Sequence, residues 1–197
     1  MALQTLTGQR AVPHSPERWF FALLPDEPLR AAIAAQAVAL RDSHRPAGRA
    51  LNPERYHLTL RYLGLFSPTP DWLEAAACMA AAQVRVGQFC WALDCAGSFE
   101  NSRVWWLGTR RRSAALMGLR ETLDRALLAT GAPWSTDRQG FHPHVTVQRE
   151  VRAPLAESIT PLPWEVREFV LIRSRPPRPY EVIARWPCLG PESTAPG

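Results

Sequence analysis

His57 and Thr59 are the first residues of this chain whose types and spacing indicate chemistry. They lie two positions apart in the stretch RYHLTLRYLG at 55–64, where the apolar Leu58 and Leu60 alternate with them. Successive side chains of a β-strand point to opposite faces, so His57 and Thr59 share one face while the leucines pack against the other. A single occurrence is usually incidental, because half-buried strands carry polar residues on their solvent face.

A second copy of the pattern lies in FHPHVTVQRE at 141–150, where His144 and Thr146 alternate with two valines. Each copy ends a stretch with the character of strand, helix and strand. Two such units are expected to form two pseudo-symmetric lobes, which would bring both polar faces to one cleft. The duplication therefore favours a site over two incidental surface patterns.

Two histidines that face each other provide an acid and a base, since an unperturbed imidazole titrates at about pH 6.5. The hydroxyls of Thr59 and Thr146 are suited to bind non-bridging phosphoryl oxygens. Such a site opens a cyclic phosphodiester: one histidine takes a proton from water and the other gives one to the leaving ribose oxygen, while the threonines stabilise the developing charge. This chemistry needs no metal and no cofactor, and we predict neither.

Two arginines close to the motifs are candidates for phosphate binding. Arg61 lies four positions after His57, so alternation places it on the same face, either as a phosphate contact or as a solvated charge. Arg149 lies five positions after His144, and alternation places it on the opposite face. Only a β-bulge or the end of the strand would turn Arg149 inward.

Three further features have plain structural explanations. His142 and His144 form a His-x-His pair that can bind a metal, yet no carboxylate cluster accompanies it, so we expect a structural role for His142. Trp105 and Trp106 alternate faces, which predicts one core residue and one residue able to stack on a base. The arginine run at 110–112 is typical of a solvated turn, with electrostatic guidance of RNA as the alternative.

Apolar periodicity and turn residues predict the other elements. Helices are expected over 28–42, 70–84 and 113–129, with Pro28, Pro70 and Ser113 at their starts. Strands are expected over 18–24, 56–63, 89–95, 104–109, 144–150, 166–173 and 180–186.

Composition describes an ordinary globular chain with a basic balance. The 197 residues are 46% hydrophobic and 21% charged, enough for one core or two small lobes that share one. The formal net charge is +5, and the excess comes mainly from arginine, which suits bidentate phosphate contacts. Genome composition is an alternative source of arginine richness.

The ends and the cysteines of the chain indicate its surroundings. Residues 1–17 and 188–197 have the composition of flexible tails, which leaves one domain over 18–187. The N-terminus lacks the pattern of a secretory signal, and no apolar run is long enough to span a membrane. The four cysteines have no metal-type spacing. We expect reduced thiols in a cytoplasmic protein.

The stretches HLTLRYLG and FHPHVTVQRE resemble the paired HxTx motifs of the 2H phosphoesterase superfamily. More closely, the chain resembles the bacterial RNA 2′,3′-cyclic phosphodiesterases, also called 2′-5′ RNA ligases. RWFFALLPD is similar to the first strand of that family and SRVWWLG to its central strand. The resemblance covers about residues 18–186.

The resemblance implies an α+β fold of two pseudo-symmetric lobes, each an antiparallel sheet with outer helices, around a central cleft. It implies that His57 is the proton donor, that His144 is the proton acceptor, and that Thr59 and Thr146 bind phosphate. Arg149 matches an arginine just after the second motif of the family. The implied products are 2′-phosphomonoesters of RNA, formed without a metal, and some members run the reverse 2′-5′ ligation.

We therefore expect an enzyme acting on RNA or oligonucleotides with 2′,3′-cyclic phosphate ends, acting as a monomer and away from membranes. The alternative of a different class is a non-catalytic protein that binds RNA ends on the same fold. Intact histidines and threonines in both motifs argue against that alternative. No lysine motif for adenylation is recognisable, so any ligation would be the hydrolysis chemistry in reverse.

Overall fold

The alternation of apolar and polar residues around both motifs produces two neighbouring strands at the centre of a single sheet. The computed structural model describes residues 15–99, 101–134 and 140–189. The strands are β1 (Glu17–Leu23), β2 (Arg49–Ala50), β3 (Leu58–Phe66), β4 (Phe89–Phe99), β5 (Val104–Gly108), β6 (His144–Arg149), β7 (Ala156–Val166), β8 (Glu168–Ser174) and β9 (Tyr180–Pro187). The helices are α1 (Glu27–His44), α2 (Trp72–Ala81) and α3 (Ala114–Ala129), with a 3₁₀ turn η1 at Pro53–Arg55.

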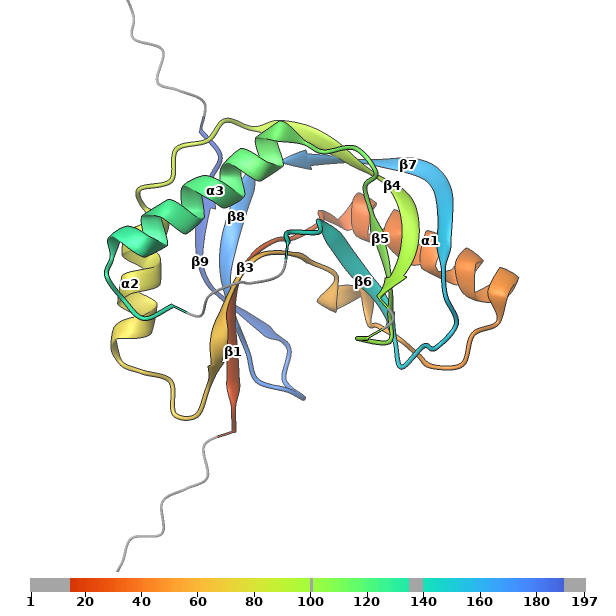
Figure 1. The fold of residues 1–197 in the computed structure, drawn as a ribbon, viewed down its shortest axis with the longest axis horizontal. Coiled ribbons are helices and arrows are strands. Elements are labelled where there is room, and N and C mark those ends of the chain that lie inside the picture. Colours follow the sequence, from red (N-terminus) through yellow and green to blue (C-terminus); the bar gives the residue numbers. More distant parts are fainter. Residues whose placement is uncertain (1–14, 100, 135–139, 190–197) are drawn as a thin grey trace, which may run out of the picture.

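The strand order β7-β4-β5-β6-β3-β1-β8-β9 divides the sheet into two equivalent halves. Strands β3, β1, β8 and β9 form one lobe, and β6, β5, β4 and β7 form the other, with every paired neighbour antiparallel. The short β2 pairs with β6 beside this path. The predicted α+β fold with two pseudo-symmetric antiparallel lobes is confirmed (Figure 1).

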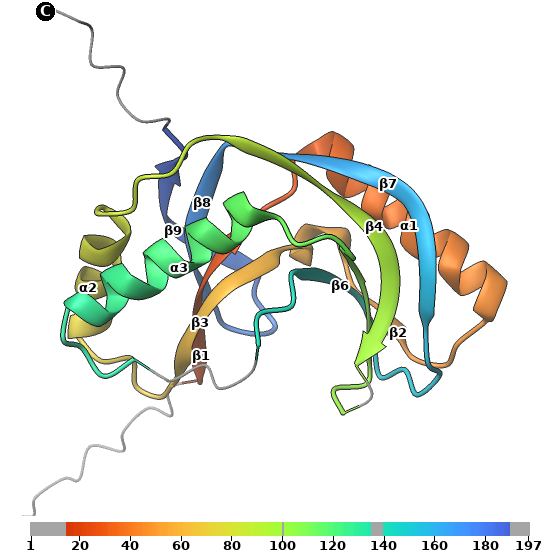
Figure 2. The ribbon, with the colours of Figure 1, turned by 45° about the horizontal axis from the view of Figure 1, so that its top comes forward.

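The helices cross over between the lobes. Helix α1 follows β1 in the chain but packs against β6 and β7, and α3 follows β5 but packs against β3, with α2 alongside it. Figures 1 and 2 place α2 and α3 at one end of the molecule and α1 at the other. Each lobe is thus covered by a helix whose preceding strand belongs to the other lobe, which links the two halves.

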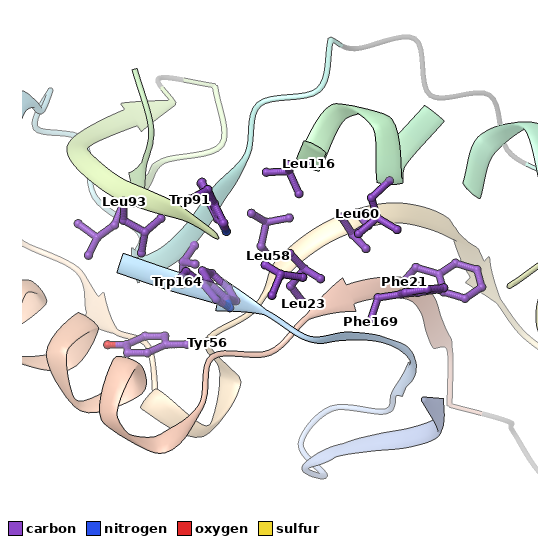
Figure 3. Close-up of a cluster of buried hydrophobic side chains, with 14 of the residues drawn as sticks. Phe21, Leu23, Tyr56, Leu58, Leu60, Trp91, Leu93, Leu116, Trp164 and Phe169 are labelled. Carbon is purple, nitrogen blue, oxygen red and sulfur yellow. The ribbon is translucent and has the colours of Figure 1, made fainter. Parts of the chain in front are cut away.

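The two lobes meet where β3 and β6 cross. Leu58 and Val145 are direct antiparallel partners at this crossing, and both are fully buried. Leu60 and Val147, the other apolar residues of the motifs, are also buried. Figure 3 shows Leu58 and Leu60 within a cluster that receives residues from both lobes, among them Phe21, Trp91 and Leu116. The apolar half of each motif therefore anchors its strand in a common core.

Capping residues determine where two of the helices begin. The carboxylate of Asp26 accepts a hydrogen bond from the amide of Leu29 at 3.0 Å, so α1 begins one residue before the predicted Pro28. The hydroxyl of Ser113 accepts from the amide of Leu116 at 3.3 Å, as predicted for α3. Helix α2 is shorter than predicted at both ends.

Strand β7 is the longest of the elements that sequence reasoning missed, the others being the short β2 and η1. Pro161 and Pro163 argue against a strand in this region, because proline donates no ladder hydrogen bond. In the structure β7 is the outermost strand of its lobe, and both prolines are exposed. An edge strand accommodates proline where its missing amide faces solvent, and Trp164 still stacks on Trp91 with ring centroids 5.5 Å apart.

The tails predicted over 1–17 and 188–197 lie largely outside the described residues. Where they are described, the fold extends into them: Glu17 begins β1, and Cys188 is fully buried, with its amide donating to the carbonyl of Arg167 at 2.7 Å. All four cysteines are free thiols. In the described part of the chain, no helix has the length and apolar character needed to cross a membrane.

The crossing predicts a large and local effect on stability. Leu58→Ala should lower the free energy of unfolding by about 3 kcal/mol, because it leaves a cavity between the lobes. Leu65→Ala is the matched control, since Leu65 lies in the same strand but is 53% exposed, and it should cost about 0.5 kcal/mol or less. Urea unfolding of both variants measures the difference. Equal losses would contradict the role given to the crossing.

Candidate active site

The pairing of Leu58 with Val145 brings the polar residues of both motifs together. In an antiparallel pair, the neighbours of these two residues face one another, so His57 lies across from Thr146 and Thr59 across from His144. All four side chains are on the face opposite the buried leucines and valines, and each is only partly buried. One buried contact thus assembles two imidazoles and two hydroxyls on a single surface.

Both imidazoles are held in the same way. Nδ1 of His57 lies 2.8 Å from the carbonyl oxygen of Arg55, and Nδ1 of His144 lies 2.6 Å from the carbonyl oxygen of His142. A carbonyl oxygen only accepts, so Nδ1 carries the proton and donates it in both rings. Nε2 of each neutral ring is therefore the basic nitrogen, and it remains for the site.

Aromatic residues from other strands of the same lobe enclose each histidine. The His57 ring lies 4.9 Å from the ring of Phe20 and meets Tyr180 edge-on at 5.2 Å. The His144 ring meets Phe99 edge-on at 4.9 Å. These contacts fix the ring planes, and they also remove water from around both imidazoles.

This enclosure makes both imidazoles weak bases. The pKa of His57 is lowered to about 4, mainly by burial and also by the charges of His144, Arg149 and Arg55, while the hydrogen bond to the Arg55 carbonyl opposes the shift. Burial also lowers the pKa of His144, with Arg149 acting in the same direction and the His142 carbonyl opposing. Both rings are therefore neutral at pH 7.

A bulge at the same position of each motif decides which residue next faces the site. The pairing of β1 with β3 skips Leu60, and the pairing of β5 with β6 skips Val147; each lies three residues after its histidine. After a bulge the side-chain alternation shifts by one residue. Tyr62 and Arg149, each five residues after a histidine, consequently point to the site.

Alternation along the strand allowed Arg149 to reach the site only if a bulge turned it inward. The structure contains that bulge, at Val147. Arg149 lines the same cavity as His57 and Thr59, and its charge acts on both histidines. The prediction that Arg61 shares the face of His57 is wrong, because the bulge turns it to the other side of β3. Arg61 is 8% exposed, and its Nε lies 3.0 Å from Asp124 of helix α3. Its surroundings are those of a strand–helix ion pair.

Two cavities meet at the motifs, and Thr59 and Tyr62 line both. The arginine pocket, of about 670 Å³, lies on the His57 side. It is lined by Arg18, Arg49, Arg55, Arg149, His57 and Tyr180, among others. The aromatic pocket, of about 860 Å³, lies on the His144 side. It is lined by Phe99, Asn101, Phe141, His142, His144 and Arg120, among others.

The other residues singled out in the sequence lie around the site in different roles. His142 supplies the carbonyl that holds His144, and its ring lines the aromatic pocket. Trp105 is a core residue, as one of the two tryptophans was expected to be. Trp106 lines neither pocket, so the structure gives no support to base stacking there. Its ring lies 5.2 Å from Phe99 and 6.3 Å from His144, behind the site.

The space for Trp106 depends on two glycines. A Cβ atom added at Gly97 or at Gly108 would lie less than 3.0 Å from the Trp106 ring. The tryptophan thus supports Phe99 and His144 from behind. The arginines at 110–112 are exposed and line neither pocket, in agreement with a solvated turn.

Sequence reasoning missed Arg55, Tyr62 and Tyr180. Arg55 Nη2 donates to the carbonyls of Pro177 and Arg178 at 3.1 and 2.6 Å, and its guanidinium lies 5.1 Å from the centre of the Tyr180 ring. These contacts hold the β8–β9 turn beside His57, a distant pairing with no local signal. Tyr62 had a signal: it occupies the place in the first motif that Arg149 occupies in the second.

Among the described residues, no group of three or more His, Cys, Asp or Glu side chains is arranged to hold a metal ion. The donors that converge on the site are two imidazoles, hydroxyl groups and guanidinium groups. Such a set of groups is suited to bind an anion and to transfer protons.

Comparison with known proteins matches this geometry to one family. Residues 25–177 match the model of the 2′-5′ RNA ligase superfamily. The RNA 2′,3′-cyclic phosphodiesterase of Escherichia coli K12 is 34% identical over 182 residues, which cover 87% of this chain and 96% of that protein. The Aeropyrum pernix protein of the same name is 32% identical over 123 residues, 59% of this chain and 67% of that protein.

Solved structures give the same match. The crystal structure of E. coli LigT with 3′-AMP has a TM-score of 0.69 and 33% identity, and the alignment covers 87% of this chain and 98% of that one. LigT with phosphate has a TM-score of 0.68 at 30% identity, covering 90% and 99%.

The enclosure of the histidines can be tested by NMR titration of their ring signals. His57 should titrate at about pH 4, and His144 below the ordinary value of 6.5. Arg149→Gln should raise the pKa of both, because it removes a positive charge that disfavours the imidazolium. Arg152→Gln, which removes an exposed arginine three residues away, should leave both unchanged. Ordinary pKa values in the unmodified protein would refute the description of the site.

Proposed function

Because the chain belongs to the 2′-5′ RNA ligase superfamily, we propose that it is an RNA 2′,3′-cyclic phosphodiesterase. It hydrolyses the cyclic phosphate at RNA or oligonucleotide ends to a 2′-phosphomonoester, without a metal. The observation that carries the proposal is the pair of imidazoles on one face, each with Nδ1 engaged by a carbonyl and Nε2 left for the substrate. E. coli LigT, which this fold matches, has been solved with phosphate and with a nucleoside monophosphate.

Each step of the reaction has a residue of suitable type. Nε2 of neutral His144 takes a proton from water as the oxygen attacks phosphorus, and the bond from phosphorus to O3′ breaks. His57, protonated at Nε2, gives its proton to the departing O3′. Thr59, Thr146 and Arg149 bind the non-bridging oxygens and stabilise the charge that develops on them. The choice of His57 as acid and O3′ as leaving group follows the family that the motifs resemble.

Binding of the substrate favours the protonated form of His57 that the proposed mechanism needs, and the proton itself comes from solvent. His57 is neutral in the free protein at pH 7, since burial and neighbouring positive charges lower its pKa. A bound phosphate anion opposes both effects, because its negative charge offsets that of Arg149 and attracts the imidazolium. Protonation of His57 is thereby coupled to binding of the cyclic phosphate.

Reverse 2′-5′ ligation uses the same residues with a 5′-hydroxyl in place of water. The observation that favours it is the aromatic pocket, which continues the cleft beyond His144 and is large enough for a nucleoside. We further propose that the protein acts as a monomer in the cytoplasm.

The central test uses an oligonucleotide that ends in a 2′,3′-cyclic phosphate, with EDTA present. The protein should open the ring, and His57→Ala and His144→Ala should each lose about 10³-fold or more in kcat, because acid and base act as a unit. His44→Ala is the control, since His44 pairs with Glu157 outside both pockets. Tight binding without product would favour the non-catalytic RNA-end-binding alternative, and full activity of either site variant would refute the mechanism.

The dependence of kcat/KM on pH gives a separate prediction. The active free enzyme has protonated His57 and neutral His144, and the pKa of each lies below 6.5. Activity should therefore rise with pH as His144 loses its proton and fall with pH as His57 loses its own. The maximum should lie on the acid side of pH 6.5, and Arg149→Gln should move the alkaline limb upward. A plateau from pH 7 to 9 would contradict this assignment.

A further inference from the structure

The arginine pocket carries more positive charge than one phosphate requires. Arg18, Arg49, Arg55 and Arg149 enter it from β1, β2, η1 and β6, and its lining contains no carboxylate. Arg18 and Arg149 make no ion pair with any described residue. Arg49 reaches only Glu150, at 3.9 Å and with both side chains 65% exposed. Such a surplus raises the local concentration of anions.

The position of Arg49 opposite Arg149 makes the excess positive charge destabilising for the fold. Arg49 and Arg149 are direct antiparallel partners between β2 and β6. Like charges directly opposite each other destabilise a strand pair. An anion between or beside the two guanidinium groups removes that cost, so this pair favours a ligand with negative charge over an empty pocket.

Two of the four arginines already have other roles. Arg55 holds the β8–β9 turn through two carbonyls, and Arg149, whose charge acts on both histidines, is the arginine assigned above to the reacting phosphate. Arg18 and Arg49 are exposed and have no part in the proton transfers. They come from different lobes, so their side chains border the pocket from two sides.

The assignment of His57 as acid and His144 as base indicates which part of the substrate occupies the arginine pocket. His57 protonates the ribose oxygen that leaves, so the ribose of the reacting nucleotide lies on the His57 side, where the arginine pocket is. Water attacks from the His144 side, beside the aromatic pocket. The RNA on the 5′ side of the reacting nucleotide therefore passes through the arginine pocket.

We propose that Arg18 and Arg49 bind the phosphodiester on the 5′ side of the terminal nucleotide, so that the enzyme favours oligonucleotides over cyclic mononucleotides. This inference rests on the proposed function, because it uses the direction of ring opening. A pocket of about 670 Å³ holds a nucleotide together with part of its neighbour. Arginine suits the task because its planar fork binds phosphate oxygens in pairs.

The experiment compares adenosine 2′,3′-cyclic phosphate with an ApA dinucleotide that ends in a 2′,3′-cyclic phosphate. The unmodified protein should show a kcat/KM about 10-fold or more higher for the dinucleotide, since its one extra phosphodiester meets two guanidinium groups. R18Q/R49Q should lose this preference and keep its activity on the mononucleotide. Replacing the internal phosphodiester by an uncharged methylphosphonate should abolish the preference in the unmodified protein.

R110Q/R111Q is the matched control, because it removes the same charge from a region outside both pockets. It should keep the preference for the dinucleotide. R18Q/R49Q should also reduce the salt dependence of dinucleotide binding, with a change of about 1 in the slope of log K against log[salt]. Arg49→Gln alone should not lower Tm, since the substitution removes the repulsion with Arg149.

Three results would overturn the inference while the proposed function stands. These are equal kcat/KM for the two substrates in the unmodified protein, a preference that survives R18Q/R49Q, and a loss of the same size on both substrates. If the unmodified protein opens neither ring, the proposed function fails instead. Calorimetry then measures binding of the 2′-phosphorylated ApA dinucleotide and of 2′-AMP to the unmodified protein, R18Q/R49Q and R110Q/R111Q. Tighter binding of the dinucleotide that only R18Q/R49Q loses would support the phosphodiester site, and any other pattern would overturn it.

Discussion

The contact between Leu58 and Val145 is the constraint on which the rest of the molecule depends. The two halves of the sheet are joined between β3 and β6 through this one residue pair, which also places the polar residues of both motifs. Burial of apolar side chains specifies the register, because a slip by one residue would exchange the buried and exposed faces of the strand. The same slip would turn the histidines into the core. Fold stability and site geometry therefore have a common origin in the apolar half of the HxTx pattern.

Pseudo-symmetry explains much of the site, and its breakdown explains the rest. Both histidines are held through Nδ1 by a carbonyl two residues earlier, and both motifs have a bulge three residues after the histidine. The residue that returns to the cleft differs: Tyr62 in one lobe and Arg149 in the other. One lobe therefore presents a positive charge to the cleft, and the other presents an aromatic hydroxyl. The two sides of a nearly symmetric cleft therefore differ in charge and in hydrogen-bonding groups.

The sequence allowed the central part of this arrangement to be predicted, since it depends on local patterns. Alternation placed the polar residues on one face, and the duplicated motif predicted the lobes. What alternation does not contain is a bulge, which is why Arg61 was assigned to the wrong side and Arg149 to the right one only conditionally. Strand β7 was missed because its prolines are acceptable only at an edge, and edge position is a property of the whole sheet. Arg55 acts through a turn more than a hundred residues away, a contact that the chain reveals only when folded.

The electrostatics of the cleft are arranged for the complex with substrate. In the free protein, burial among aromatic residues and the neighbouring arginines disfavour an imidazolium, so His57, the proposed general acid, is neutral at pH 7. In the complex that we propose, the cyclic phosphate supplies the negative charge that these groups lack, and it becomes a partner for both Arg149 and His57. The proton required for catalysis therefore becomes stable only when there is a substrate to receive it. Ligands without a negative charge leave His57 neutral, so the same burial that lowers the pKa of the histidine selects for anionic substrates.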